Sequence, residues 1–122
     1  MSVTSFTIKQ LGKAKIAATA VGSADAIATN ITGEDMTITN IIGRNQDSVA
    51  RTIYLCNVPD GDTPDADDVF YEREIPAGGS FFIRPEDIKM VMSDTDDALK
   101  AYASATNTFN VWAFGSVQPD QS

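Results

Sequence analysis

Between residues 36 and 117, short runs of apolar and β-branched residues alternate with turn-forming residues. Met36 and Ile38 alternate with Thr37 and Thr39, and a period of two is typical of a strand with one buried face. Gly, Pro, Asn and Asp separate further runs that are rich in β-branched and aromatic residues, namely RTIYLCNV, VFYEREI, SFFIR, ALKAYAS and FNVWAFGSV. The pattern predicts an all-β fold, an antiparallel sandwich or jelly roll of six to eight strands with an N-terminal arm.

Two segments fit this pattern less well. SDTDDALKAYASA has Ser93 or Asp94 as a helix N-cap with an acidic first turn behind it. We prefer a strand there, because the spacing to the next turn suits a hairpin and alternate residues such as Leu99 and Ala101 would share one face. RPEDIKMVM has Pro85 near its beginning, directly after Arg84, and a proline there predicts a turn or one helical turn.

The chain length of 122 residues and its 43% hydrophobic content are enough for one domain with one core. Residues 1–30 are rich in Ala, Thr, Ser and Gly and are expected to form an N-terminal arm or edge-strand segment that packs weakly, with a strand near residues 5–11. Residues 31–118 are expected to form the sandwich, and residues 119–122 a C-terminal tail.

The predicted strands are apolar on both faces. In TIYLCNV, Ile53 and Leu55 lie opposite Tyr54, Cys56 and Val58, and the last strand shows the same pattern. A two-layer sandwich buries one face of each sheet, so apolar residues on the other face require a cover, either the arm or another subunit. We therefore predict a protein interface formed by Tyr54, Val58, Trp112, Phe114, Lys9, Lys13 and Lys15.

The net charge of the chain limits the classes of partner that it can bind. The net charge of −8 repels phosphate backbones and anionic lipid surfaces, so neither nucleic acid nor a membrane is expected as a partner. Residues 1–33 are nevertheless basic, with three lysines and one aspartate, and are expected to contact an acidic neighbour. No run is long enough to span a membrane, and the N-terminus lacks the apolar core of a secretory signal, which predicts synthesis in a cytoplasm.

The stretch NVPDGDTPDADDVFYE places five aspartates within nine residues. An EF-hand that starts at Asp60 would need glycine at its sixth position and glutamate at its twelfth, but these positions hold Asp65 and Tyr71. We interpret the stretch as a solvated turn between strands, since Asp-Gly and Thr-Pro are ordinary turn sequences. A looser calcium site is the weaker alternative, and its ligands would be Asp60, Asp62, Asp65, Asp67 and Asp68.

Catalytic signals are missing from the sequence. There is no histidine, no phosphate-binding loop and no nucleophile elbow, and Cys56 has no histidine to activate it. A single cysteine also excludes an internal disulfide. Aspartates in one exposed loop lack the contrast of environments that a glycosidase pair needs, and Ala77–Ser80 is interpreted as a hairpin turn. We predict a protein that is not an enzyme and has no cofactor.

The order of motifs resembles that of small β-sandwich virion proteins of tailed bacteriophages. IKQLGKAKIAATA, MTITNIIGRN, TIYLCNVPDGD and VFYEREIPAGGSFF follow that order, and the closing element LKAYASATNTFNVWAFGS, from Leu99 to Ser116, is the most specific part. The acidic stretch departs from the pattern. The resemblance implies a structural, oligomer-forming virion part that is made in the cytoplasm of a bacterial host, with no catalytic residues to carry over.

The expected function is that of a capsid decoration or cement protein that clamps neighbouring shell subunits. Its partners would be itself, as a homo-oligomer with a trimer favoured, and phage capsid or neck and tail proteins. One alternative is a neck, tail-tip or fibre-attachment adaptor. A less favoured alternative is a carbohydrate-binding module, with Trp112 or Tyr71 as a stacking platform and calcium at the aspartates.

Overall fold

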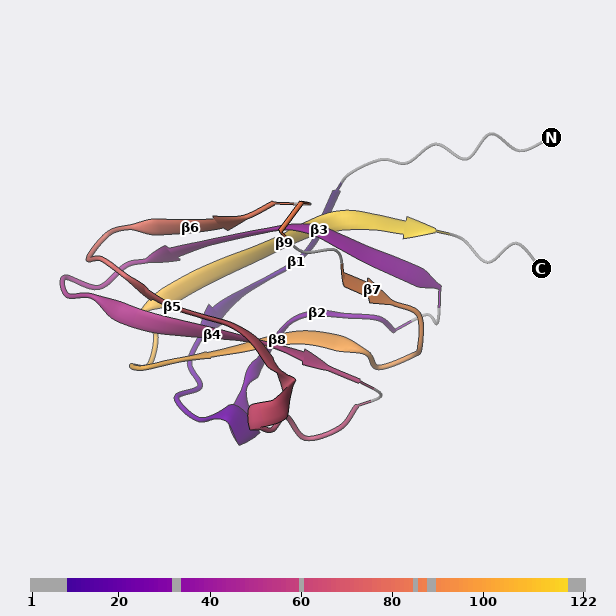
Figure 1. Cartoon of the computed structure of the whole chain (residues 1–122), viewed down its shortest axis with the longest axis horizontal. Helices are drawn as coiled ribbons and strands as arrows, with labels where there is room; N and C mark the ends of the chain where they lie inside the picture. The colour runs from indigo at the N-terminus through magenta and orange to yellow at the C-terminus, as the bar shows by residue number, and fades with distance from the viewer. Residues whose placement is uncertain (1–8, 32–33, 60, 85, 88–89, 119–122) are drawn as a thin grey trace.

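A computed structural model describes residues 9–31, 34–59, 61–84, 86–87 and 90–118 (Figure 1). These residues form nine strands in two antiparallel sheets that pack against each other, which confirms the predicted β-sandwich. The five-stranded sheet has the order β1-β9-β3-β6, and β7 pairs with β3 as well; the four-stranded sheet has the order β2-β8-β4-β5. The strands are β1 (Lys9–Ile16), β2 (Asp25–Thr29), β3 (Asp35–Asn45), β4 (Arg51–Val58), β5 (Val69–Ile75), β6 (Ser80–Ile83), β7 (Met90–Met92), β8 (Ala98–Ala103) and β9 (Phe109–Gln118).

The core lies between the two sheets and follows the alternation of side chains along the strands. In β9, Phe109, Val111 and Ala113 are buried, whereas Trp112 and Phe114 on the other face are only partly buried. The aromatic rings of the core meet in a chain, in which Phe81 lies 6.4 Å from Phe109 and 5.6 Å from Tyr71 between ring centroids. The largest fully buried side chains include Phe109, Ile16, Ile38, Ile41, Ile53, Leu55, Ile75, Met92 and Leu99.

The N-terminal segment contributes an edge strand to each sheet. Strand β1 pairs with β9, and β2 pairs with β8. Ile16 is fully buried and Ile27 is 4% exposed, so the expectation that residues 1–30 pack weakly is wrong for the described part of this segment. Residues 1–8, which hold most of the strand predicted at 5–11, and the tail at 119–122 lie outside the described residues.

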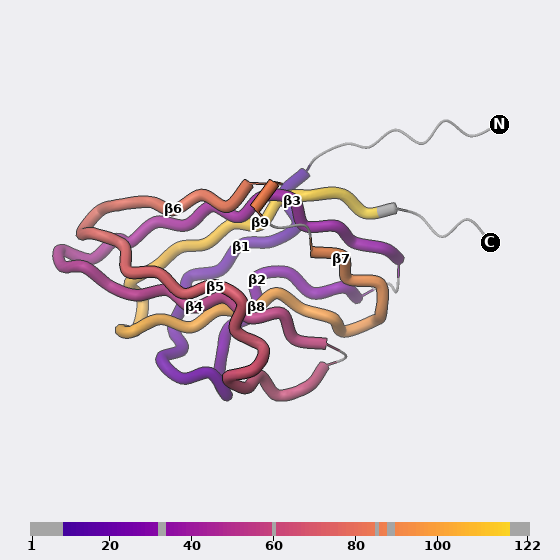
Figure 2. The backbone as a smooth tube through the Cα atoms, viewed as in Figure 1, coloured from indigo at the N-terminus to yellow at the C-terminus, as the bar shows by residue number. Residues whose placement is uncertain are grey.

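Most turns connect one sheet with the other, which the sequence pattern did not predict. Strands β5 and β6 lie in different sheets, and so do β8 and β9 (Figure 2). The turn at Ala77–Ser80 therefore does not close a hairpin within a sheet, although Gly78 has the expected positive φ of 68°. The residues 98–103 form a strand, as we preferred, while β2 and the short β7 were not predicted.

The two long sides of the sandwich differ. On one side β1 and β2 contact each other across the sheets, and a Cβ added to Gly12 would collide with the backbone carbonyl of Ile27, so only glycine allows this approach. On the other side the edge strands β5 and β6 leave a cavity between them. Among the described residues, no helix is long and apolar enough to cross a membrane.

We expect Phe109→Ala to lower the free energy of unfolding by about 3–5 kcal/mol, because the ring is fully buried and its removal leaves a cavity. Phe82→Ala is the matched control: Phe82 is 48% exposed, and its loss should cost about 1 kcal/mol or less. Urea unfolding followed by tryptophan fluorescence measures both. Equal losses for the two variants would contradict the assignment of Phe109 to the core.

Candidate interaction surfaces

Large apolar side chains form a row across the outer face of the five-stranded sheet. The register places Lys13 opposite Trp112, Trp112 opposite Ile42, and Ile42 opposite Phe82. Paired residues of neighbouring antiparallel strands point to the same face, so these four side chains form one line across the sheet. Phe82 is 48% exposed, and Trp112 and Ile42 are partly exposed. Trp112 therefore lies on the face of β9 that points away from the core.

Cations lie at one end of this apolar row and along one side of it. In the next row Lys15 lies opposite Asn110, which lies opposite Arg44. Lys13 and Lys15 line a hollow of about 320 Å³ beside Trp112. In the third row Phe114 is partly exposed between Gln10 and Asn40. The outward positions of these three rows hold three cations, Lys13, Lys15 and Arg44, and no carboxylate. All the residues at these positions are Gln10, Lys13, Lys15, Asn110, Trp112, Phe114, Asn40, Ile42, Arg44, Ser80 and Phe82. We call this surface the cationic face.

The outer face of the four-stranded sheet has a different centre. The rings of Tyr54 and Tyr102 stack there with centroids 4.4 Å apart and an angle of 3° between their planes. Glu72 lies opposite Tyr54, and Glu74 lies opposite Thr52, both on the edge strand β5 and both exposed. We call the surface of Tyr54, Tyr102, Thr52, Glu72 and Glu74 the acidic face.

Two of the predicted interface residues, Val58 and Lys9, lie apart from the outward aromatic residues, and so does Tyr71, the stacking platform of the carbohydrate-binding alternative. Val58 is fully buried, so its assignment to an interface is wrong. Lys9 is exposed at the beginning of β1, opposite Gly115, outside the three rows. Tyr71 packs against the core, with its ring centroid 5.6 Å from that of Phe81, and it also lines a cavity, so its use as a stacking platform for sugars stays a prediction.

The acidic loop itself covers part of β4. The 3-10 helix η2 (Ala66–Asp68) contacts β4, and Pro64 is buried. Cys56 and Val58, which point to the outer side in a simple alternation, are fully buried. The sequence pattern could not show this cover, because the loop folds back onto the strand that precedes it.

Aspartate side chains of this loop accept hydrogen bonds from its own backbone amides. The Asp65 side chain accepts a hydrogen bond from the Asp67 amide at 2.9 Å, and the Asp68 side chain accepts one from the Asp65 amide at 3.0 Å, which forms a capping box. The Gly61 amide donates to the carbonyl of Asp96 at 3.1 Å. Within the described ranges no group of His, Cys, Asp or Glu is placed to hold a metal ion, and Asp60 of the alternative calcium site lies outside them.

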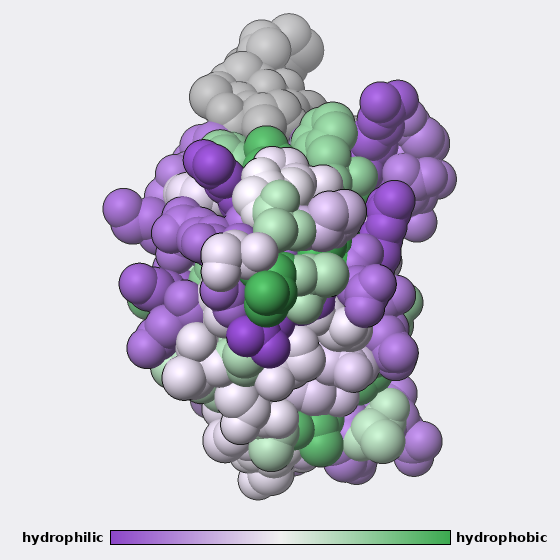
Figure 3. Space-filling view, turned by 90° about the vertical axis from the view of Figure 1, so that its left-hand side faces the viewer, coloured by the Kyte–Doolittle hydropathy of each residue, from purple (hydrophilic) through white to green (hydrophobic). Residues whose placement is uncertain are grey.

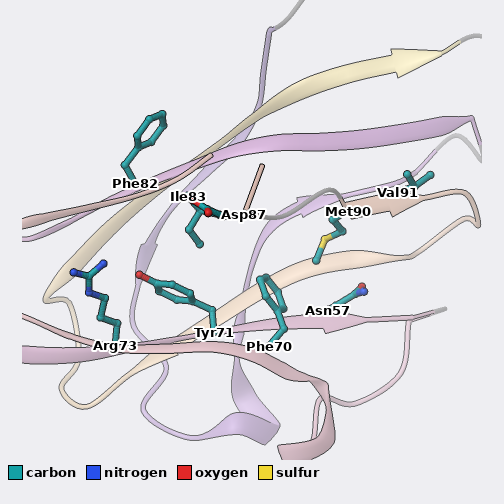
Figure 4. Close-up of a pocket in the computed structure, with 9 residues that line it drawn as sticks. All are labelled: Asn57, Phe70, Tyr71, Arg73, Phe82, Ile83, Asp87, Met90 and Val91. Carbon is teal, nitrogen blue, oxygen red and sulfur yellow. The ribbon is translucent and has the colours of Figure 1, made fainter. Parts of the chain in front are cut away.

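A third candidate site is the cavity on the open side, which the sequence analysis missed. It has a volume of about 670 Å³, and Tyr71 and Phe70 project into it from β5, toward Ile83 and Met90 of the other sheet (Figure 4). Phe70 is the extra residue at a β-bulge opposite Leu55 and Cys56. The cavity forms between strands that are distant in the chain, so no local pattern signals it. Its lining is Asn57, Phe70, Tyr71, Arg73, Phe82, Ile83, Asp87, Met90 and Val91.

The end of the sandwich that holds the β3–β4 and β5–β6 turns presents a more polar surface. Figure 3 faces this end and shows hydrophilic residues on both flanks, with only small hydrophobic areas between them. Single exposed apolar residues of this kind are normal on a protein surface. The outer faces of the two sheets are therefore the stronger candidates for an interface.

Comparisons with known proteins do not assign the chain to a family. No family model matches it, and no curated protein matches it. Among solved structures, a chain from work titled "Bacillus endospore appendages form a novel family of disulfide-linked pili" aligns over 97% of this chain and 96% of its own length, with 17% identity and a TM-score of 0.33. A likeness at that TM-score supports no argument about function.

We expect Asp65→Ala to lower the free energy of unfolding by about 0.5–2 kcal/mol, because it removes an N-cap acceptor. Asp62→Ala is the control and should leave stability within about 0.5 kcal/mol, since Asp62 is exposed. Thermal unfolding of both variants, with and without millimolar calcium, measures this. A calcium-dependent rise in Tm of the unmodified protein that both substitutions remove would establish a metal site instead.

Burial, together with a smaller effect of the nearby Asp68 carboxylate, raises the pKa of the Cys56 thiol to about 11. The thiol ionises at a higher pH in the folded chain than in the unfolded chain, whose value is near 9.0. Its contribution to stability is therefore complete below pH 9 and is lost as the pH rises toward 11.

We expect the free energy of unfolding to fall by up to about 1.4 kcal/mol per pH unit between pH 9 and 11 because of Cys56. Cys56→Ala isolates this effect, since the difference between the two proteins should shrink over that interval. Urea unfolding at a series of pH values measures it. A pH-independent difference would mean that the thiol is not shielded from water in the folded protein.

Proposed function

We propose that the chain is a non-enzymatic structural component of a tailed-phage virion, a decoration or cement protein that binds neighbouring shell subunits and forms homo-oligomers. The observation that carries this proposal is the outward row of Trp112, Ile42 and Phe82 on the cationic face. Large apolar side chains across an open sheet face gain about 25 cal/mol for each Å² that a partner covers. The resemblance of residues 99–116 to virion proteins supplies the biological setting.

The mechanism of such a protein is mechanical. Each copy would cover apolar area at a contact between shell subunits, and the contact would be repeated over the whole particle, so that modest affinities act together. The acidic loop would face away from the shell, where its carboxylates keep the particle surface soluble. The chain would work at the virion after synthesis in the cytoplasm of the bacterial host.

Copy number tests this proposal. Quantitative mass spectrometry of purified particles of the phage that encodes the chain should find it in a number comparable with that of the major shell protein. A handful of copies per particle would favour the neck or tail adaptor, and absence from the particle would refute a virion function.

We expect Trp112→Ala to reduce the occupancy of the protein on particles about tenfold or more, because a large aromatic side chain at an interface contributes strongly to binding. Val49→Ala is the control, since Val49 is 48% exposed but lies in the β3–β4 turn, away from both sheet faces. Binding of each purified variant to particles that lack the protein measures occupancy. Equal binding of the two variants would exclude the cationic face from the contacts, with the shell or between copies, that hold the protein on the particle.

A further inference from the structure

The two outer faces of the sandwich have the same layout with opposite charges. Each begins at an edge strand with two like charges that are two residues apart, Lys13 and Lys15 on β1 and Glu72 and Glu74 on β5. All four side chains are exposed. Among the described residues, these carboxylates and lysines take part in no salt bridge.

The aromatic residues repeat this correspondence on the neighbouring strands. Lys13 lies opposite Trp112, and Trp112 lies opposite Ile42 on the third strand. Glu72 lies opposite Tyr54, and Tyr54 lies opposite Tyr102 on the third strand of its sheet. Both faces therefore have charge at the edge and large partly buried side chains on the next two strands.

Strand geometry gives the two faces the same dimensions. Residues at i and i+2 of a strand are separated by about 6.8 Å, and neighbouring strands by about 4.8 Å. The two lysines are consequently spaced like the two glutamates, and each pair lies one strand away from its aromatic residue. A pair of faces with matched spacing and opposite charge is complementary.

We propose that the cationic face of one copy docks on the acidic face of a second copy. The edge strand β1 of the first copy would lie over the edge strand β5 of the second, with the lysine pair against the glutamate pair. Because both faces have the same layout when viewed from outside, β1 would run antiparallel to β5, with Lys13 against Glu74 and Lys15 against Glu72. Trp112 would then lie over Thr52 beside Tyr54, and Arg44 would lie over Tyr102, at the distance of about 10 Å that separates packed sheets.

The charges disfavour a two-fold dimer through either face alone. A two-fold dimer that lays β1 on β1 would place Lys13 and Lys15 against the same lysines, and one that lays β5 on β5 would place Glu72 and Glu74 against the same carboxylates, which is unfavourable. A two-fold dimer that lays opposite edges on each other would leave both charged pairs without a partner of opposite charge. Lys100 also points outward on the four-stranded sheet, opposite Cys56, but the neighbouring η2 carries Asp67 and Asp68. The contact is therefore heterologous, and it closes into a ring or continues as a filament according to the rotation between copies.

This inference rests on the homo-oligomer of the proposed function and names its surfaces. It is tested with two variants of the full chain, Lys13→Glu with Lys15→Glu, and Glu72→Lys with Glu74→Lys. Asp62→Lys with Asp94→Lys is the control, because it changes the net charge as the second variant does, but at exposed positions of the β4–β5 and β7–β8 loops. Circular dichroism establishes that each variant is folded, and light scattering coupled to size exclusion measures its mass at low and high ionic strength.

We expect the unmodified protein and the control to associate at low ionic strength, with an apparent affinity at least about tenfold weaker in 0.5 M salt. Each sheet-face variant should remain monomeric by itself, because both of its faces then carry the same sign. An equimolar mixture of the two folded variants should associate again, because every contact then joins opposite charges. Recovery in the mixture is a result that a general loss of stability cannot produce.

Three outcomes would overturn the inference. The first is that the unmodified protein has monomer mass at every concentration up to about 1 mM. The second is that the folded charge-reversed variants associate as strongly as the unmodified protein. The third is that an equimolar mixture of the two variants does not associate. If the protein nonetheless occupies purified particles in high copy number, the proposed virion function stands while docking between copies fails. If the lysine variant loses particle binding without any change in self-association, the occupant of the cationic face is a shell protein.

Discussion

Burial of one apolar layer between two sheets is the constraint on which the rest of this structure depends. Strands β4 and β9 each send alternate residues into that layer, Ile53 and Leu55 from one sheet and Phe109 and Val111 from the other. Because the layer accepts only one face of each strand, the remaining large residues must point outward. The partly exposed positions of Tyr54 and Trp112 follow directly from this geometry.

The two sheets differ in how far their outward apolar residues are covered. On the four-stranded sheet, the acidic loop returns over β4 and buries Cys56 and Val58, while the tyrosine pair remains at the surface. On the five-stranded sheet, no described segment covers the centre, and Trp112 and Ile42 lie beside Lys13, Lys15 and Arg44. The same loop therefore has a structural role as well as its charge, and its aspartates act as acceptors for its own amides.

The edges of the sheets carry the charges that distinguish the two faces. Lys13 and Lys15 lie on one edge strand, and Glu72 and Glu74 lie on another, with Arg73 at the inward position between the glutamates. Charges on edge strands hinder the uncontrolled pairing of exposed strands. Where they also lie beside aromatic residues on a sheet face, they limit which surfaces can meet.

The sequence by itself determined the all-β class, most of the strands, the two apolar faces of the strands that hold Tyr54 and Trp112, and the absence of recognisable catalytic motifs, because these properties depend on alternation and residue type within a few positions. Tertiary structure alone decided that residues 9–30 enter both sheets, that turns such as Ala77–Ser80 connect one sheet to the other, and that Val58 is buried. It also decided that Lys13, Trp112 and Ile42 form one row. These features depend on contacts between segments far apart in the chain, and a local pattern contains no information about which strands become neighbours.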